Sequence, residues 1–365
     1  MRVLALVTDA YGGHGGIALY NRDVLKALCL HEKVSEVVAI ARCASEYSEK
    51  IPQKLIYDTS GITSSFSFLK AVFKALTKKK YEVILCCHIN LMPLAWIIGK
   101  ILRVPVILEI YGIEAWQPRG KSIAEYLSAS ADSVISISEY TRERYLNWSR
   151  LNPENCKILP NAIHAEKYGM GSKPEYLAKR YGVNDRKVLL TFGRIVSKER
   201  AKGFDEVLDV LPALIKQDSE IRYVIAGDGE YYQALVDKVA SMNLSEYVVF
   251  TGMVDEAEKA DLYRLADVYV MPSRGEGFGF VFLEAMACGI PVIASKVDGS
   301  REAVLDGELG AIVDPDNLAE IENAITEALA LSREIPHRLE YFSFNNFATR
   351  LHKIIDETLT KGVRA

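Results

Sequence analysis

The sequence predicts an α/β protein of two doubly wound domains, on three observations. Short, nearly continuous apolar runs alternate with segments of helical length, as in parallel sheets covered on both faces. This pattern occurs twice, once in each half of the chain. The length of 365 residues exceeds the roughly 250–300 at which single cores stop growing. We therefore expect two sheets facing a central cleft, with ligands bound at the carboxyl ends of the strands.

The predicted strands are short, and a segment long enough for a helix follows most of them. In the first half they are Val3–Val7, Val37–Ile40, Val83–Cys87, Val106–Ile110 and Ser133–Ile137. In the second half they are Val188–Phe192, Tyr223–Ala226, Val248–Phe250, Val268–Met271 and Val292–Ala294. Between the halves, the turn formers Pro160 and Asn161 open a polar stretch without periodicity. We place the domains at residues 1–163 and 164–345, and a helix at 346–365.

Composition and charge exclude several classes of protein. The balance of 49% hydrophobic and 25% charged residues is that of an ordinary globular chain, and a net charge of −4 gives no reason to expect nucleic acid as a partner. The six cysteines include no C-x-x-C pair, which favours a reducing compartment over disulfides or zinc. Thr8 and Asp9 come too early for a signal peptide, and charges and prolines interrupt the apolar stretch Leu91–Ile110. We expect a cytoplasmic protein.

A glycine-rich loop, Tyr11–Gly16, follows the first strand and precedes a predicted helix. Glycines let the backbone approach a ligand closely, and the helix N-terminus offers free N–H groups to a phosphate. The loop matches neither G-x-G-x-x-G nor the P-loop. On these residues alone it is either a phosphate site or a simple turn.

The strongest motif lies between Glu276 and Ser295, around a helix predicted to open near Gly279. Glu276 precedes this helix, and Glu284 lies just over one turn inside it. Both carboxylates can face the cleft while the N–H groups of Gly279 and Phe280 point at a phosphate. A carboxylate accepts two hydroxyl hydrogen bonds, as a ribose diol or a sugar requires. The alternative is a capped core helix, which would leave Glu284 unpaired among apolar residues at a high cost.

Two cations follow another predicted strand, in the segment Phe192–Asp205. Arg194 and Lys202 bracket a loop, and each is next to a glycine. Fixed cations there would stabilise the charge that develops on a leaving diphosphate. The alternative is a solvated loop, which suits the intervening charged residues better than these two.

Two weaker signals also follow strands. The turn Ala226–Glu230, which contains Gly227, is suited to lining a nucleotide cleft, although Asp228 there could simply cap a helix. His88 ends the strand Val83–Cys87, where a polar side chain can face the cleft or serve the fold alone.

In this order, the segments resemble the retaining GT-B glycosyltransferases of family 4, which include bacterial mannosyl-, glucosyl- and galactosyltransferases of lipid and polysaccharide assembly. The matches cover nearly the whole chain: G-G-H-G-G, F-G-R…K-G-F-D, A-G-D-G-E, the specific E-x7-E block with A-C-G-x-P-V-I-A-S, and G-S-R-E at Gly299–Glu302. The insertion K-E-R-A before Lys202 is similar to the insertion in polysaccharide mannosyltransferases. The resemblance implies two Rossmann-like domains in a GT-B fold, with the last helix crossing back to the N-terminal domain.

By the resemblance, Glu284 would hold the ribose hydroxyls and Glu276 the donor sugar. Backbone N–H groups and the two cations would bind the diphosphate, joined by the glycine loop of the N-terminal domain. The set implied for donor binding is Gly15, Gly16, Arg194, Lys202, Gly227, Glu276, Gly279, Phe280 and Glu284. The set implied for catalysis is His88, Arg194, Lys202 and Glu276.

One departure from the family pattern is Tyr111, which stands where many relatives have a histidine. His88 could then take a donor-side role instead. In this family the reaction resembles a front-face substitution, in which the leaving phosphate takes the acceptor proton and positioning and cations supply most of the catalysis. We expect no metal and no cofactor, and interpret the D-x-D match Asp314–Asp316 as a turn.

The inferred reaction transfers a hexosyl group from a UDP- or GDP-sugar to a glycan or lipid-linked acceptor, in polysaccharide or glycolipid synthesis. Two alternatives stay open. A nucleotide-sugar epimerase of the same architecture would need no acceptor. A non-catalytic nucleotide-sugar- or glycan-binding module would need neither Glu276 nor Lys202.

A basic and apolar segment at residues 66–80 permits two interpretations. It could form a surface helix that touches anionic lipid at the inner membrane surface. The alternative, which we favour, is a solvated helix with its apolar face in the core. The residues concerned are Phe66, Phe68, Leu69, Lys70, Val72, Phe73, Lys74 and Lys78–Lys80.

Overall fold

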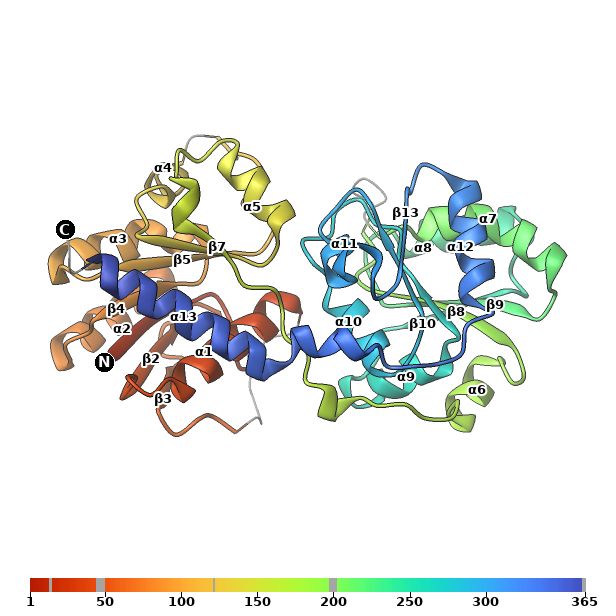
Figure 1. The fold of residues 1–365 in the computed structure, drawn as a ribbon, viewed down its shortest axis with the longest axis horizontal. Coiled ribbons are helices and arrows are strands. Elements are labelled where there is room, and N and C mark those ends of the chain that lie inside the picture. Colours follow the sequence, from red (N-terminus) through yellow and green to blue (C-terminus); the bar gives the residue numbers. More distant parts are fainter. Residues whose placement is uncertain (13–14, 44–49, 121, 197–201, 363–365) are drawn as a thin grey trace. The chain divides into compact units, whose positions relative to one another are not determined.

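A computed structural model of the chain describes residues 1–12, 15–43, 50–120, 122–196 and 202–362 (Figure 1). The chain divides into two compact units. Unit 1 comprises Met1–Ala162 and Phe344–Ala365, and unit 2 comprises Ile163–Ser343. Each unit has its own parallel sheet and its own core.

Unit 1 is built on a seven-stranded sheet in the order β3-β2-β1-β4-β5-β6-β7, with every pairing parallel. Its strands are β1 (Arg2–Val7), β2 (Glu36–Ala41), β3 (Leu55–Asp58), β4 (Val83–Cys86), β5 (Val106–Ile110), β6 (Ser133–Ser136) and β7 (Cys156–Ile158). Its helices are α1 (Gly16–Leu30), α2 (Ser65–Lys78), α3 (Met92–Leu102), α4 (Ile123–Ser128), α5 (Glu139–Leu146) and α13 (Phe344–Gly362). Strand order reverses at β1 and β4, so the switch point, where such sheets bind ligands, lies at the carboxyl ends of these two strands.

The core of unit 1 explains its unbroken apolar strands. Leu4 and Leu6 of β1 belong to one buried cluster with residues of α2 and α3, such as Val72 and Ile98. The C-terminal helix α13 belongs to this unit and runs along α1 (Figure 1). Phe347 of α13 packs edge-on against Tyr20 of α1, with ring centroids 5.6 Å apart. Helix α13 thus completes the fold of unit 1, although unit 2 separates it from the rest of that unit in the sequence.

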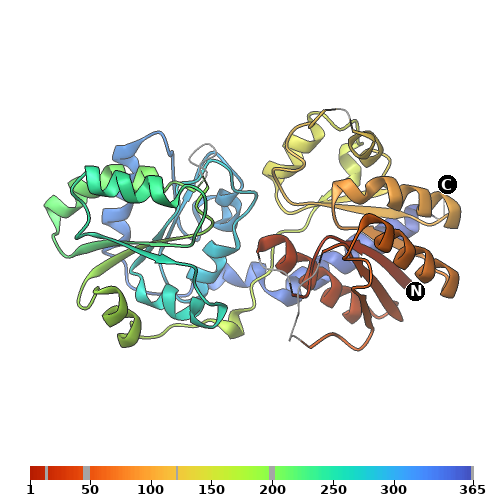
Figure 2. The same cartoon turned by 180° about the vertical axis from the view of Figure 1, so that it is seen from behind.

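Unit 2, whose residues are drawn from green to blue in Figure 2, has a six-stranded sheet. Its strand order is β10-β9-β8-β11-β12-β13, and each of these pairings is parallel. Its strands are β8 (Lys187–Phe192), β9 (Ile221–Ala226), β10 (Val248–Gly252), β11 (Val268–Val270), β12 (Val292–Ser295) and β13 (Ala311–Val313). Its helices are α6 (Glu175–Tyr181), α7 (Phe204–Gln217), α8 (Tyr232–Ser241), α9 (Lys259–Leu265), α10 (Phe280–Ala287), α11 (Ser300–Ala303) and α12 (Leu318–Ala328). Its switch point lies between β8 and β11, so the loops after these strands are where a ligand is expected.

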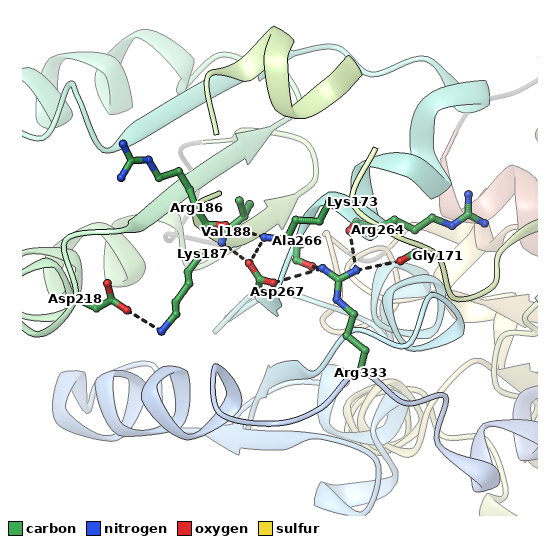
Figure 3. A network of polar contacts seen from close by, with 10 residues as sticks. All are labelled: Gly171, Lys173, Arg186, Lys187, Val188, Asp218, Arg264, Ala266, Asp267 and Arg333. Atoms are coloured by element: carbon green, nitrogen blue, oxygen red, sulfur yellow. Dashed lines mark hydrogen bonds and ion pairs between the residues drawn. The ribbon is translucent and has the colours of Figure 1, made fainter. Parts of the chain in front are cut away.

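A polar network fixes the segments that lead into and out of the core of unit 2 (Figure 3). Asp267, just before β11, accepts hydrogen bonds from the Lys173 ammonium and from the backbone N–H of Val188. Arg333, after α12, donates to the carbonyls of Gly171, Arg264 and Ala266. Both connecting segments are therefore attached at the amino ends of β8 and β11, the edge opposite to the expected site.

Helix α2 has an apolar face in the core, as in the interpretation we favoured, but its solvent side departs from that interpretation. Its core-facing residues are Phe68, Ala71, Val72 and Ala75. Phe66 and Phe73, however, lie on the outside with 79% and 69% of their surface exposed, and Leu69 between them is also exposed. The helix is thus apolar on its solvent side as well, next to its lysines. Within the described ranges, no helix combines the length and apolar character needed to cross a membrane.

Candidate active site

Loops after neighbouring strands of unit 2 bring Lys202 and Glu276 together. Lys202 precedes α7, at the end of the loop after β8, and Glu276 lies between β11 and α10. Since β8 and β11 pair in parallel, their carboxyl ends lie at the same edge of the sheet. The Lys202 ammonium forms an ion pair with Glu276 Oε2, and both side chains are partly buried. Two residues 74 positions apart, predicted from separate motifs, are in direct contact.

Helix α10 begins at Phe280, four residues after Glu276, with Gly279 at its N-cap position. Its first turn holds no acidic side chain, and the described residues supply no side-chain cap. The N–H groups of this turn, which starts at Phe280, therefore carry an uncompensated partial positive charge. Together with Lys202, they form a setting suited to an anion such as phosphate.

Glu284 on α10 lies in a different environment from the one expected. Its side chain is buried, with 3% of the residue exposed. Oε1 accepts hydrogen bonds from the Tyr168 hydroxyl at 2.8 Å and the Lys259 ammonium at 2.6 Å, and Oε2 accepts one from the Tyr263 hydroxyl at 2.7 Å. Our argument that a core position would leave Glu284 unpaired is therefore wrong, because three donors satisfy it. Its burial does not by itself indicate a ligand.

The cluster around Glu284 adds a cation that the motifs did not indicate. Lys259 opens α9 and is itself only 8% exposed. Its ammonium lies 5.6 Å from the centre of the Phe192 ring, at the end of β8. Nothing in the sequence around Lys259 marks it, because its partners Glu284 and Phe192 come from other elements.

Arg194 and Gly227 occupy the turns after β8 and β9. Arg194 is exposed. Gly227 lies against the neighbouring turn so closely that a Cβ there would be 2.0 Å from the carbonyl oxygen of Gly193. Gly227 therefore sets the position of the Gly193–Arg194 turn. Residues 197–201 between Arg194 and Lys202 lie outside the described residues.

In unit 1, the glycine loop and His88 lie at the expected switch point. Gly15 is the N-cap residue of α1 and Gly16 its first residue, after β1. His88 follows β4, and its Nδ1 accepts a hydrogen bond from the N–H of Asn90 at 3.1 Å. Burial lowers the pKa of His88, which favours the neutral ring. Residues 13 and 14 of the glycine loop lie outside the described residues.

Tyr111 points into unit 1 and is held in a buried polar cluster. Its hydroxyl lies 2.7 Å from Asn21 Oδ1 and 2.9 Å from both the Cys87 carbonyl and Glu109 Oε2. Glu109 is fully buried, and this burial raises its pKa to about 7. Tyr111 therefore links β5 to α1 and to the end of β4. The sequence showed the unusual tyrosine but not this cluster.

The D-x-D match is a turn in the structure. Asp314 Oδ1 accepts a hydrogen bond from the N–H of Asp316, and Asp316 pairs with Arg274. Among the residues that the structure describes, no group of three or more His, Cys, Asp or Glu is placed to hold a metal ion.

Two family models match the chain in succession. The model described as Glycosyltransferase Family 4 matches residues 14–167, and the model described as Glycosyl transferases group 1 matches residues 173–345. The chain belongs to glycosyltransferase family 4. The first match covers strands β2 to β7 of unit 1 in this family 4 chain, and the second covers strands β8 to β13 of unit 2.

Similar proteins agree with this assignment. This family 4 chain is 32% identical, over 224 residues, to the GDP-mannose-dependent alpha-(1-6)-phosphatidylinositol monomannoside mannosyltransferase of Mycolicibacterium smegmatis. That alignment covers 58% of this chain and 57% of the relative, so the chain spans little more than half of the relative's length. An uncharacterized glycosyltransferase of Methanocaldococcus jannaschii is 28% identical to this chain. That alignment covers 86% of this chain and 85% of the relative.

A solved structure shows the fold. Anabaena HepE, crystallised in complex with UDP, matches with a TM-score of 0.78 and 20% identity, covering 98% of this chain and 100% of HepE. The chain thus has the α/β GT-B fold, with two Rossmann-like parallel sheets. At this level of identity the likeness concerns the fold alone.

Proposed function

We propose that this protein is a retaining, metal-independent glycosyltransferase that moves a hexosyl group from a UDP- or GDP-sugar to a glycan or lipid-linked acceptor. The observation that carries the proposal is the Lys202–Glu276 ion pair beside the uncapped N-terminus of α10, in a family 4 chain. A cation and free N–H groups suit a diphosphate, and an adjacent carboxylate suits sugar hydroxyls. The reaction belongs, in this proposal, to polysaccharide or glycolipid synthesis.

Catalysis in unit 2 rests on charge stabilisation. As the glycosidic bond breaks, negative charge grows on the leaving diphosphate, and Lys202, Arg194 and the first turn of α10 can meet it. The leaving phosphate then takes the acceptor proton, so no carboxylate nucleophile is required. Lys202 is already held by Glu276, which keeps the ammonium in place before the donor arrives.

The proposed ribose role of Glu284 requires a local exchange of partners. An ionised carboxylate has about four lone-pair sites, and three are used by Tyr168, Lys259 and Tyr263. A ribose diol brings two further O–H donors. We therefore propose that the Tyr168 hydroxyl, the only one of the three donors outside α9, leaves Glu284 when a nucleotide binds.

Two of the similar proteins support a UDP- or GDP-sugar as the donor. The mycobacterial relative depends on GDP-mannose, and HepE was crystallised with UDP. A thermal-shift screen of UDP, GDP and their sugars tests the proposal, because a ligand at about 100 times its Kd raises stability by roughly 2.7 kcal/mol. Transfer with the stabilising donor, followed by NMR of the product, should show a retained anomeric configuration.

Other outcomes of this experiment reject the proposal. Release of an isomerised sugar without an acceptor would identify an epimerase. Stabilisation by a nucleotide sugar without turnover, over a panel of glycan and lipid-linked acceptors, would identify a binding module. A product with inverted anomeric configuration would reject the retaining mechanism and leave the rest of the proposal standing.

We also propose that the outer side of α2 touches anionic lipid, where a lipid-linked acceptor would be found. Phe66, Leu69 and Phe73 follow one another at helical spacing and are exposed, beside Lys70 and Lys74. Such a surface combines apolar insertion with attraction to lipid headgroups. This peripheral contact would place the protein at the inner face of the membrane.

Vesicle co-sedimentation tests this surface. Binding to phosphatidylglycerol-containing vesicles should exceed binding to phosphatidylcholine vesicles about tenfold and weaken with salt. Replacing both Phe66 and Phe73 by serine should abolish it. Met253→Ser, at an exposed apolar position of unit 2, is the matched control. The proposal would be contradicted if the wild type bound both vesicle types equally, or if the double variant bound as well as the wild type.

A further inference from the structure

A fully buried carboxylate, Asp298, lies beneath the loop that carries Glu276. Asp298 is 0% exposed and stands between β12 and α11. Its Oδ2 accepts hydrogen bonds from the Ser273 hydroxyl at 2.7 Å and from the backbone N–H of Glu276 at 2.8 Å. Its Oδ1 accepts two from Ser300, from the N–H at 3.0 Å and from the hydroxyl at 2.6 Å. Four donors thus converge on one side chain and join two loops.

The next residue closes the connection from the other side. The N–H of Gly299 donates to the carbonyl of Glu276 at 2.9 Å. The two backbones lie so close that a Cβ on Gly299 would be 2.2 Å from the carbonyl oxygen of Gly277. Both peptide groups of Glu276 are therefore fixed by the Asp298–Gly299 pair. Only the side-chain torsions of Glu276 stay free, and Lys202 holds its carboxylate.

We propose that Asp298 is the positioning residue for Glu276. It fixes the backbone of Glu276 so that the Glu276 carboxylate can contact both Lys202 and the donor sugar. This inference rests on the sugar-binding role proposed for Glu276. Asp298 does not touch the substrate and acts through the loop. Displacements of about 1 Å in a reacting group reduce rates by roughly a hundredfold, so such a support has a measurable effect.

Asp298→Asn is the direct test, because it preserves the shape of the side chain. The amide keeps one oxygen, which can still accept from Ser300, but turns an NH2 group toward the N–H of Glu276. Two donors then face each other, and the loop has to move. We expect kcat to fall about ten- to a hundredfold with the intact nucleotide sugar, while the Kd for the free nucleotide changes less than about threefold.

Burial raises the pKa of Asp298 to about 6, which adds a second readout. Below that pH the wild-type carboxyl gains a proton and can no longer accept from all four donors. The wild-type rate should therefore fall on the acid side of about pH 6, and Asp298→Asn should lack this step. The Kd for the free nucleotide should not share this step, whereas a general loss of structure in unit 2 would weaken nucleotide binding over the same pH range.

Two further variants keep the test decisive. Gly299→Ala perturbs the same contact with Asp298 intact, and should lower kcat while sparing free-nucleotide binding, even if Asp298→Asn fails to fold. Asp267→Asn removes a hydrogen-bonded carboxylate at the opposite edge of the same sheet, and is the matched control. It should lower the stability of unit 2 but leave kcat within about twofold.

The outcomes separate this inference from the proposed function. If the wild type transfers no sugar with any donor, the proposed function fails. If the wild type is active and a folded Asp298→Asn or Gly299→Ala keeps its kcat, only the positioning role fails. An equal loss of kcat in Asp267→Asn would also overturn it, since the effect would then be one of general stability.

Discussion

The Glu109 carboxyl should make unit 1 less stable as the pH rises, and Glu109→Gln should remove that dependence. Glu109 is fully buried on β5, and burial raises its pKa from 4.5 to about 7. The Tyr111 hydroxyl has one proton and three oxygen neighbours: Glu109 Oε2, Asn21 Oδ1 and the Cys87 carbonyl. One proton cannot serve three acceptors. More of the hydrogen-bond acceptors in this cluster are satisfied when Glu109 is protonated and donates to the Tyr111 hydroxyl.

The direction of the pH dependence follows from the raised pKa. The folded state holds this proton more tightly than the unfolded chain, so its contribution to stability is complete below about pH 4.5 and is lost as the pH rises through about 7. At about 1.4 kcal/mol per pH unit, this corresponds to roughly 3 kcal/mol. Burial also raises the pKa of Tyr20, Cys87 and Tyr111, which therefore stay neutral in this range and add no slope.

Hydrogen exchange, followed by mass spectrometry on peptides from β4 and β5, measures this locally. Between about pH 5 and pH 8.5, and after correction for intrinsic exchange, wild-type protection should fall about a hundredfold relative to Glu109→Gln. Glu143→Gln, at an exposed position of α5, is the control and should follow the wild type. If the ratio of wild-type protection to Glu109→Gln protection stayed constant across this pH range, a protonated Glu109 in the folded state would be refuted.

Three further predictions concern unit 2. Activity should survive excess EDTA, and a complete loss that Mg²⁺ or Mn²⁺ reverses would reject the metal-free mechanism. Lys202→Ala should lower kcat far more than it raises the donor KM, because the cation meets charge that grows in the transition state; steady-state kinetics with an unchanged kcat would make Lys202 an ordinary loop residue. Glu284→Gln should lower the stability of unit 2 by about 3–5 kcal/mol in urea unfolding, because it removes the buried anion 2.6 Å from the Lys259 ammonium and leaves that ammonium with the longer, 3.9 Å contact to the exposed Glu256. The double variant Lys259→Met, Glu284→Gln should recover most of that loss, and a single variant as stable as the wild type would show that the pair is not held as described.

The sequence predicted the fold well where strands are buried on both faces. The ten predicted runs, such as Val3–Val7 and Val188–Phe192, all coincide with strands of the two sheets. The predictions missed β3, β7 and β13, which lie at the edges of their sheets. An edge strand has neighbours on one side only, so its sequence can be short and mixed in polarity, as in Leu55–Asp58. Periodicity finds the centre of a parallel sheet more easily than its margins.

The site was predictable only where chain topology decides it. Lys202 and Glu276 follow paired strands, so their convergence follows from the order of β8 and β11. The partners of Glu284 do not follow from topology, because Tyr168 and Lys259 come from a connecting segment and from α9. The same holds for Asp298, whose contacts depend on the path of two loops. Counting unpaired charges from sequence fails when the compensating charge lies on another element.

The glycines of the family motifs illustrate a further limit. Gly227 of A-G-D-G-E packs against the carbonyl of Gly193 in F-G-R, and Gly299 of G-S-R-E packs against the carbonyl of Gly277 in E-G-F-G. Motifs that are separate in the sequence are therefore paired in space, backbone against backbone. A glycine at such a position is required whether or not a ligand approaches it, because any Cβ would meet the neighbouring loop. Gly227 thus holds the Arg194 turn in place through backbone packing, and this structural role is independent of the donor-binding role predicted for it.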